Sequence, residues 1–193
     1  MTDKLIPGHW GHAAVYIGTD EELKNLGIWD ELERLKDAGD RYFTQEKIDS
    51  LRREIQTGKV IDEALRDGVQ INTIEHFLNI DDLAIMHDTQ ESLEDQKARI
   101  ILTLRQLGKD YDFKFDIETS IKIVCSELVY ATYFLDWETE TAAGINTISP
   151  DNVAVKSVEE NSRFTIPLLY HDGEEITTDR KAYMQGLLDG SIE

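Results

Sequence analysis

The clearest fold signal in this chain is the segment Ile121-Lys-Ile-Val-Cys-Ser-Glu-Leu-Val-Tyr130, which contains its only cysteine. The β-branched residues before Cys125 favour a strand, and the apolar residues after it recur with helical spacing. If the helix begins near Cys125 or Ser126, the sulfur lies at the positive end of the helix dipole, where free N–H groups favour the thiolate. If it begins at Asp116 or Thr119, Cys125 lies in mid-helix and is inert, and periodicity alone leaves both starts open.

The composition is that of a soluble globular protein, with 40% hydrophobic and 31% charged residues, and the length fits a single domain over residues 1–193. A formal net charge of -19 argues against nucleic acid and anionic membranes as partners, because both would repel the chain. The first residues lack the apolar core of a signal peptide, and no run is long enough to span a membrane. We therefore expect a cytoplasmic protein as written, while an exported form with a trimmed N-terminus would have the same sequence features.

A short strand is predicted over His12-Ala-Ala-Val-Tyr-Ile-Gly18, closed by its glycine. Alternation places His12, Ala14 and Tyr16 on one face of this strand. Because both faces are largely apolar, we expect a central strand, in which the histidine is buried or half-buried and needs a polar partner.

Two helices are predicted between this strand and the next one. Thr19-Asp-Glu-Glu22 fits a capping box and opens a charged helical stretch to about Lys36, and a second helix runs from about Thr44 to Gln56. We expect residues 20–58 to form a helical insertion or lid within the domain.

The remainder of the chain mixes strand-like and helix-like segments without an internal repeat. Strands are expected at 59–65, 69–71, 82–87 and 163–170, and helices at 73–78, 91–107, from Pro150 and at 179–188.

A nucleophilic cysteine needs a base, and the chain has five histidines, namely His9, His12, His76, His87 and His171. His171 lies in a predicted turn and His76 on a short helix, where surface roles are expected. His87 closes a strand and His9 lies in a loop. Only His12 is embedded in a predicted strand beside small residues, where a nucleophile could approach.

A cysteine–histidine pair usually needs a third polar group that fixes the imidazole tautomer. Asp62 and Glu63 are the strand-borne candidates, but they point to opposite faces and spacing alone does not choose between them. Other chemistries lack their motifs: there is no glycine-rich phosphate loop, no Cys-x-x-Cys and no histidine pair with i, i+4 spacing. We therefore expect no metal and no cofactor.

Several segments, taken in order, resemble the signatures of the permuted papain-like amidases, the YiiX-like branch of the NlpC superfamily. These segments are His12–Gly18, Val60–Ala64, Asp67–Val69, Leu107–Phe113, Cys125–Tyr130 and Ile148–Asp151. The likeness runs from residue 5 to about 155, and Cys-Ser-Glu-Leu-Val is its most specific part. It implies an α+β fold of the papain-like, circularly permuted NlpC type, with an antiparallel sheet packed against helices.

The resemblance also implies roles for three residues. Cys125 would be the nucleophile at the head of its helix, His12 the general base, and Glu63 the group that orients the imidazole. Glu63 is favoured over Asp62 because it precedes Ala64 in the family-like Ile-Asp-Glu-Ala stretch. The implied activity is that of a thiol hydrolase, an amidase, peptidase or acyl-transferring enzyme with a thioester intermediate, acting on a small peptide, a cell-wall-like peptide or an acyl lipid.

The sequence departs from the family pattern at its start. Relatives carry a strand with a Gly-Asp-hydrophobic signature before the histidine strand, whereas only eleven residues precede His12, so we expect one wall of the cleft to be missing or rebuilt. Glu127 would disfavour a thiolate if it faced the sulfur, and we expect it to point away. The rival hypotheses are a catalytically inactive binding module, a lipid acyltransferase or esterase on the same fold, and a purely structural Cys125. The sequence does not indicate an oligomeric state.

Overall fold

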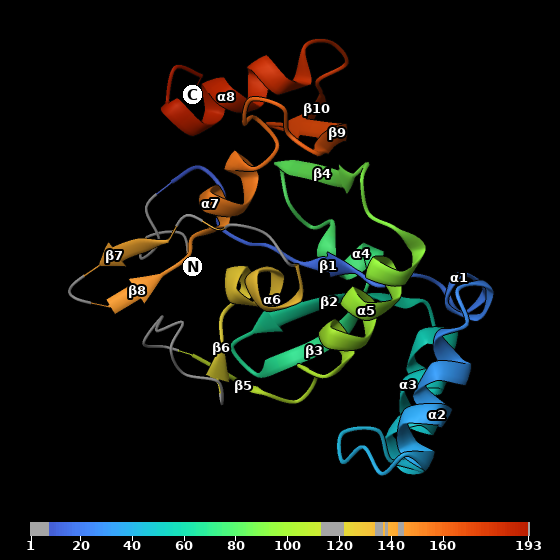
Figure 1. The fold of residues 1–193 in the computed structure, drawn as a ribbon. Coiled ribbons are helices and arrows are strands. Elements are labelled where there is room, and N and C mark those ends of the chain that lie inside the picture. The colour runs from blue at the N-terminus through green and yellow to red at the C-terminus, as the bar shows by residue number, and fades with distance from the viewer. Residues whose placement is uncertain (1–7, 113–121, 134–136, 138, 143–144, 193) are drawn as a thin grey trace.

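We describe the fold from a computed structural model over residues 8–112, 122–133, 137, 139–142 and 145–192. A three-stranded antiparallel sheet lies at the centre of Figure 1, in the order β1-β2-β3. Its strands are β1 (Val15–Tyr16), β2 (Lys59–Leu65) and β3 (Gly68–Thr73). The strands β2 and β3 form a tight hairpin that pairs Leu65 with Gly68. Gly68 is required there, since it has a φ of +104° and a Cβ would lie 2.5 Å from the Lys109 carbonyl oxygen.

Three helices separate β1 from β2, close to where the sequence predicted two helical stretches. They are α1 (Asp20–Asn25), α2 (Ile28–Asp37) and α3 (Gln45–Gln56). The Thr19–Glu22 capping box is present, and Gly27 in the left-handed region separates α1 from α2. Their buried side chains join the main core; they include Leu23, Ile28, Trp29, Leu32, Ile48, Leu51 and Ile55.

Helices α5 (Leu93–Leu104) and α6 (Cys125–Thr132) pack against each other, and α6 also contacts β2. Just before α6, the short strands β5 (Asp110–Tyr111) and β6 (Lys122–Ile123) pair in parallel. The sheet and these two helices enclose the main core, to which Ile100, Leu104 and Leu128 contribute fully or almost fully buried side chains.

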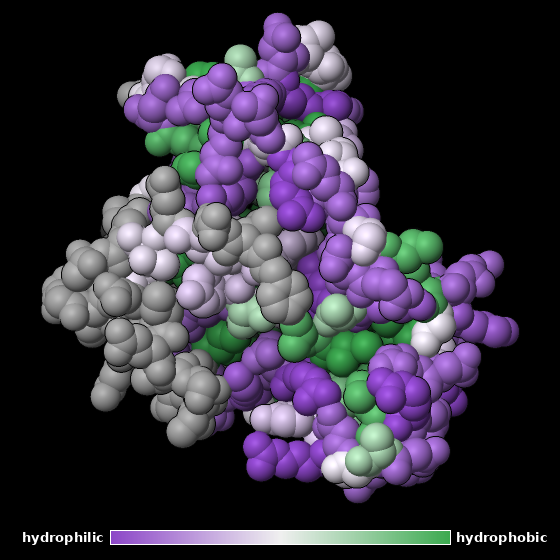
Figure 2. Space-filling view, in the orientation of Figure 1, coloured by the Kyte–Doolittle hydropathy of each residue, from purple (hydrophilic) through white to green (hydrophobic). Residues whose placement is uncertain are grey.

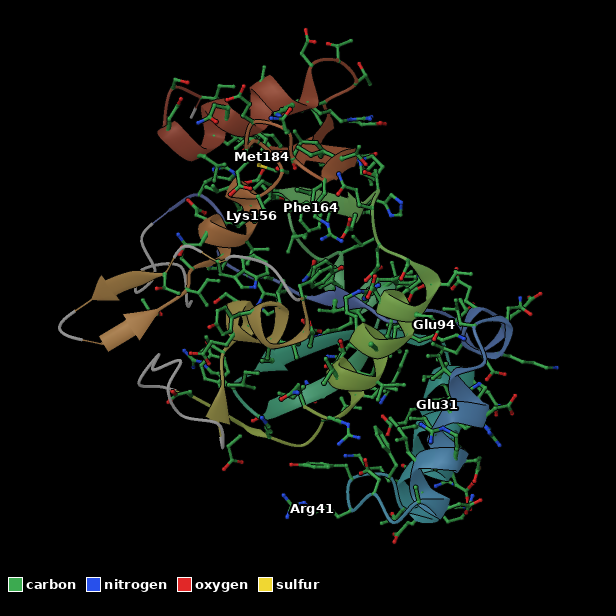
Figure 3. The ribbon with its side chains drawn as sticks, in the orientation of Figure 1. Glu31, Arg41, Glu94, Lys156, Phe164 and Met184 are labelled. Atoms are coloured by element: carbon green, nitrogen blue, oxygen red, sulfur yellow. The ribbon has the colours of Figure 1, made fainter. Side chains whose placement is uncertain are left out.

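A second antiparallel sheet forms its own layer with the C-terminal helix, at the top of Figure 1. Its strands have the order β10-β9-β4 and are β4 (Leu83–Asp88), β9 (Phe164–His171) and β10 (Glu174–Glu175). The helix α8 (Arg180–Asp189) covers it, and Met184, labelled in Figure 3 at the junction of α8 and β9, is fully buried. The helix α7 (Pro150–Val155) links this layer to α6, since it contacts both α6 and α8.

Two short elements complete the described fold. The single turn α4 (Ile74–Phe77) follows β3 and contacts both β2 and β3, and the hairpin of β7 (Glu140–Ala142) and β8 (Ile145–Thr147) projects at the left of Figure 1. The α+β class and the antiparallel sheets packed against helices are therefore as the sequence predicted.

The prediction of a central strand over 12–18 was wrong in extent and in place. The strand β1 has only two residues, lies at the edge of its described sheet, and leaves Tyr16 48% exposed. The backbone N–H groups of His9 and Trp10 donate to the Asp151 carboxylate instead of to a neighbouring strand, so the chain enters the sheet only after His12. The surface role expected for His171 was also wrong, because this residue ends β9 and is 8% exposed.

Hydrophilic residues cover much of the face seen in Figure 2, as the net charge of -19 leads one to expect. None of the described helices combines the length and the apolar character that crossing a bilayer requires.

Candidate active site

The helix α6 begins at Cys125, which confirms the start near Cys125 or Ser126 and rules out the start at Asp116 or Thr119. Val124 has the extended backbone of an N-cap residue, and its N–H donates to Glu127 Oε2 at 2.9 Å. The Glu127 carboxylate is thus used in closing the first turn of the helix.

A second hydrogen bond holds the helix start in place. Ser126 Oγ donates to the Ile148 carbonyl at 2.6 Å, and both residues are buried. It connects the head of α6 to the segment that precedes α7.

His12 and Glu63 form the first link of the site. His12 Nε2 lies 2.9 Å from Glu63 Oε2, and Asn72 Nδ2 donates to the other oxygen, Glu63 Oε1, at 2.8 Å. Glu63 is almost fully buried, with 3% of its side chain exposed, whereas 32% of the His12 side chain is exposed. Burial alone would raise the pKa of Glu63, but the hydrogen bonds from His12 and Asn72 lower it below its usual value, so the group is a carboxylate.

His12 and Cys125 form the second link through a hydrogen bond between ring and sulfur. Burial on its own would lower the pKa of His12, but the hydrogen bonds with Cys125 and Glu63 raise it from 6.5 to about 9. Burial would likewise raise the pKa of Cys125, but the His12 hydrogen bond and charge, together with the N–H groups of Ala13 and Ser126, lower it. Both shifts favour a thiolate–imidazolium pair near neutral pH.

The sulfur itself is well covered. Cys125 is 2% exposed and belongs to the main hydrophobic core, so one side of it packs against apolar groups. Its other side meets the His12 ring and the Ala13 and Ser126 N–H groups. The part of this pair that meets solvent is therefore the imidazole.

The choice between Asp62 and Glu63, which spacing left open, is decided by the faces of β2. Glu63 faces His12, and its neighbour Asp62 faces the other side, as strand alternation requires. Asp62 is 0% exposed, and both of its carboxyl oxygens lack a hydrogen-bond partner among the described residues. Burial, and next the Glu63 charge, raise its pKa well above the usual value, although Lys47 on α3 partly opposes them.

The interaction between Asp62 and Lys47 also indicates where the helical insertion of residues 20–58 packs. Helix α3 contacts β2, and its Lys47 acts on Asp62, so this helix lies on the side of the sheet that faces away from Glu63. The lid role of residues 20–58 stays a prediction.

Asp151 explains why the histidine segment runs where it does. Its carboxylate accepts the N–H of His9 at 3.0 Å and the N–H of Trp10 at 2.7 Å. Gly8 has a φ of +128°, and a Cβ at this position would lie 2.4 to 2.9 Å from the Asp151 carboxyl group, so only glycine fits. Asp151 thus anchors the segment that carries His12.

Three residues that contact His12 or Glu63 were not predicted from the sequence, namely Asn72, His76 and Phe77. Asn72 could have been found, because the tight β2–β3 hairpin pairs it with Ile61, diagonal to Glu63. The other two residues belong to α4. His76 Nε2 lies 3.8 Å from Glu63 Oε1, and the Phe77 ring centroid lies 6.2 Å from that of His12. Nothing in the local pattern of α4 indicates this.

The remaining histidines do not join this site. His87 is exposed on β4, and His9 and His171 both meet Asp82. Among the described residues, the group of side chains that could hold a metal ion is His9, Asp82 and His171, and it does not include Cys125, His12 or Glu63.

A cysteine at the head of a helix, an imidazole just before β1 and a carboxylate on β2 are the parts of a papain-like thiol hydrolase, and here the histidine precedes the cysteine in the chain. The chain belongs to the permuted papain-like amidase enzymes of the YaeF/YiiX, C92 family, whose family profile matches residues 1–178. No match was found among curated proteins or solved structures.

Proposed function

We propose that this protein is a cysteine amidase in which Cys125 is the nucleophile, His12 the general acid and base, and Glu63 the residue that orients His12. The observation that carries the proposal is the continuous hydrogen-bonded series from Cys125 through His12 to Glu63, at the N-terminus of α6. Asn72 holds the carboxylate from its other side, and Asp151 holds the backbone before His12.

The reaction follows from the protonation state of the pair. The Cys125 thiolate attacks the carbonyl carbon of an amide, and a C–S bond forms while the carbonyl oxygen becomes an oxyanion. The Cys125 N–H at the start of α6 is placed to donate to that oxyanion. As the C–N bond breaks, the His12 imidazolium gives its proton to the leaving amine. Water then attacks the thioester while His12 accepts a proton, and the carboxylic acid and the thiolate are released.

Glu63 acts through His12 and not on the substrate. Its Oε2 contacts Nε2 of the ring, which leaves Nδ1 as the nitrogen available to the thiol. The carboxylate thereby fixes the tautomer, and its charge stabilises the imidazolium that forms in the cycle.

A direct test uses the fact that the chain has a single cysteine. The protein is mixed with p-nitrophenyl acetate, quenched in acid and examined by intact and peptide mass spectrometry. We expect a burst of p-nitrophenol and an acetyl group on Cys125. Cys125→Ala should show neither. A wild-type protein that neither releases p-nitrophenol nor forms a thioester would favour the inactive binding module, and one that releases p-nitrophenol without a thioester would favour a structural cysteine.

A second candidate, an esterase or acyltransferase acting on acyl lipids, is favoured by apolar side chains next to His12. The Phe77 ring packs near the His12 ring, and in the same short segment Ile74 and Leu78 are 42% and 46% exposed. Large exposed aliphatic groups beside a reactive centre suit an apolar acyl chain.

The amidase and the acyl-lipid hypothesis predict different effects of the length of the substrate's acyl chain. If the acyl-lipid hypothesis is correct, kcat/KM should rise from p-nitrophenyl acetate to p-nitrophenyl decanoate, and Leu78→Ser should reduce only the decanoate value. Ile85→Ser, an exposed aliphatic residue on β4, serves as the matched control. Equal loss on both esters, or no preference for the longer chain, would leave the amidase as the better account.

A further inference from the structure

Three potential metal ligands meet in the C-terminal layer, from segments far apart in the chain. They are His9 before β1, Asp82 just before β4, and His171 at the end of β9. Asp82 Oδ2 lies 3.6 Å from His9 Nε2, and Asp82 Oδ1 lies 3.0 Å from His171 Nδ1. One ligand atom from each residue can be chosen so that all three lie within 4.8 Å of one another.

From this arrangement we infer that His9, Asp82 and His171 form a binding site for a divalent transition-metal ion of the zinc class. Two imidazoles and one carboxylate are ligands that zinc prefers, and three protein ligands leave a fourth position for water. With zinc–ligand bonds of about 2.0 to 2.1 Å, ligand atoms of a tetrahedral site lie about 3.3 to 3.4 Å apart. The 3.6 Å between His9 Nε2 and Asp82 Oδ2 is close to that value, and His171 Nδ1 lies 3.0 Å from the other oxygen of the same carboxylate.

An unsatisfied ring nitrogen points to the same conclusion. His9 Nε2 is a buried atom without a hydrogen-bond partner among the described residues, although the His9 side chain as a whole is 17% exposed. A buried polar atom left without a partner costs free energy. A cation bound between His9 Nε2 and Asp82 Oδ2 would satisfy both groups.

The ligands are also supported from behind, as metal ligands usually are. Asp82 Oδ1 accepts the backbone N–H of Asp172 at 2.8 Å. The Trp10 ring packs edge-on against His9 with centroids 4.8 Å apart, and the Tyr183 ring lies 5.8 Å from that of His171. Each ring is therefore held in place by packing that does not depend on the metal.

Metal binding would replace a proton. His171 Nδ1 and Asp82 Oδ1 are at hydrogen-bond distance, so one proton lies between them when no metal is bound. A metal that takes the lone pair of that nitrogen displaces its proton, which moves to Nε2 of a neutral ring or to solvent from an imidazolium, with no redox change. Affinity should therefore fall as the pH is lowered.

The site would join two parts of the molecule. His9 belongs to the segment anchored by Asp151, and His171 and Asp82 belong to the β10-β9-β4 layer. A bound ion would tie the backbone three residues before His12 to that layer. This structural role does not depend on the chemistry proposed for Cys125.

The test is a titration of the full chain, after treatment with EDTA and removal of the chelator, with Zn²⁺ by calorimetry and with Co²⁺ by visible absorption. It is done in the Cys125→Ser background, so that the thiolate is not a competing ligand. We expect one equivalent of Zn²⁺, the intense visible bands of four-coordinate Co²⁺, and a Tm raised by about 5 to 10 °C at a hundredfold excess over Kd.

The variants His9→Gln and Asp82→Asn should each weaken binding at least tenfold, whereas the controls His87→Gln and Asp81→Asn should not. Each control replaces an exposed residue of the same type on or next to β4. No binding in the parent protein would overturn the inference. Equal losses in Asp81→Asn and Asp82→Asn would also overturn it, because they would show only diffuse attraction to the acidic surface.

Discussion

Asp62 and Glu63 are consecutive residues of β2, yet their carboxyl groups face opposite sides of the sheet and their pKa values shift in opposite directions. Glu63 receives hydrogen bonds from His12 and Asn72 and is held as a carboxylate. Asp62 is fully buried, with no hydrogen-bond partner among the described residues, and its burial raises its pKa well above the usual value. Two carboxyl groups one position apart thus lie in opposite environments, and the effect of each on stability or activity can be tested separately.

The first prediction concerns Asp62 and stability. Its pKa is raised in the folded protein, so its contribution to stability is intact below the unfolded value near 4 and is lost as the pH rises through the folded value. Asp62→Asn, which has no charge to bury, should remove this loss and raise the free energy of unfolding at pH 7 by about 1 to 3 kcal/mol. Urea unfolding of both proteins from pH 4 to 8 measures this.

The control is Asp67→Asn, an exposed position in the β2–β3 turn. If Asp62→Asn were less stable than the parent at pH 7, or if both proteins lost stability equally with pH, Asp62 would not be a buried acid of raised pKa.

The second prediction concerns Glu63 as a positioning residue. Glu63→Gln keeps the shape but removes the charge and can place the imidazole in the wrong tautomer, so kcat should fall by about 10²- to 10⁴-fold with little change in KM. The pKa of His12, measured by NMR, should fall from about 9. Asn72→Ala should have a smaller effect of the same kind, because it removes one support of the carboxylate. A kcat close to that of the parent, or an unchanged His12 pKa, would argue against this role.

The third prediction concerns the pH dependence of Cys125 alkylation. The pKa of the thiol is lowered from 9.0, so the rate of reaction with iodoacetamide should reach half its maximum at a pH below 9.0. In His12→Ala the sulfur remains buried without the imidazolium, and the midpoint should move to or above 9.0. Because the sulfur is 2% exposed, absolute rates depend on access, whereas the midpoint reports the pKa.

His87→Ala should leave the midpoint unchanged. If the parent protein titrated like an ordinary thiol and His12→Ala did not move the midpoint, the thiolate–imidazolium pair would be absent.

The fourth prediction concerns Asp151, which holds the segment before His12. Asp151→Ala leaves the His9 and Trp10 N–H groups without their acceptor and should lower the free energy of unfolding by about 1 to 3 kcal/mol. It should also lower kcat, because the imidazole is less well positioned. Asp151→Asn keeps one oxygen acceptor and should fall between the two proteins in both measurements. Glu160→Ala, an exposed acid after α7, is the matched control, and a loss of stability without loss of kcat would limit Asp151 to a structural role.

Local patterns predicted the individual elements well. The capping box at Thr19–Glu22 marked the start of α1, and the starts expected near Thr44 and Pro150 lie within one residue of those of α3 and α7, because helix starts depend on neighbours in sequence. The start of α6, by contrast, has an apolar N-cap residue, Val124, and is closed by the carboxylate of Glu127. That is why periodicity left it open.

Long-range pairing was the part that local patterns misjudged. His12 was expected inside a central strand, but β1 contains only Val15 and Tyr16, and the N–H groups of His9 and Trp10 before it bind Asp151, far along the chain. His171 was expected at the surface, but α8 and the His9 segment cover it. The contacts of the His9 segment with Asp151 and His171 join residues more than 100 positions apart, which a local sequence pattern does not reveal.

The amino-acid sequence by itself determined the class of the fold, the order of its elements and, by family resemblance, which cysteine, histidine and acid to examine. It did so because helix caps, turns and hydrophobic periods are local properties of the chain. Only the tertiary structure decided that Glu63 and not Asp62 meets His12, that Cys125 heads its helix, and that His9, Asp82 and His171 converge. The physical reason is that a side chain's partner and the direction of its pKa shift are set by the faces and neighbours that packing creates.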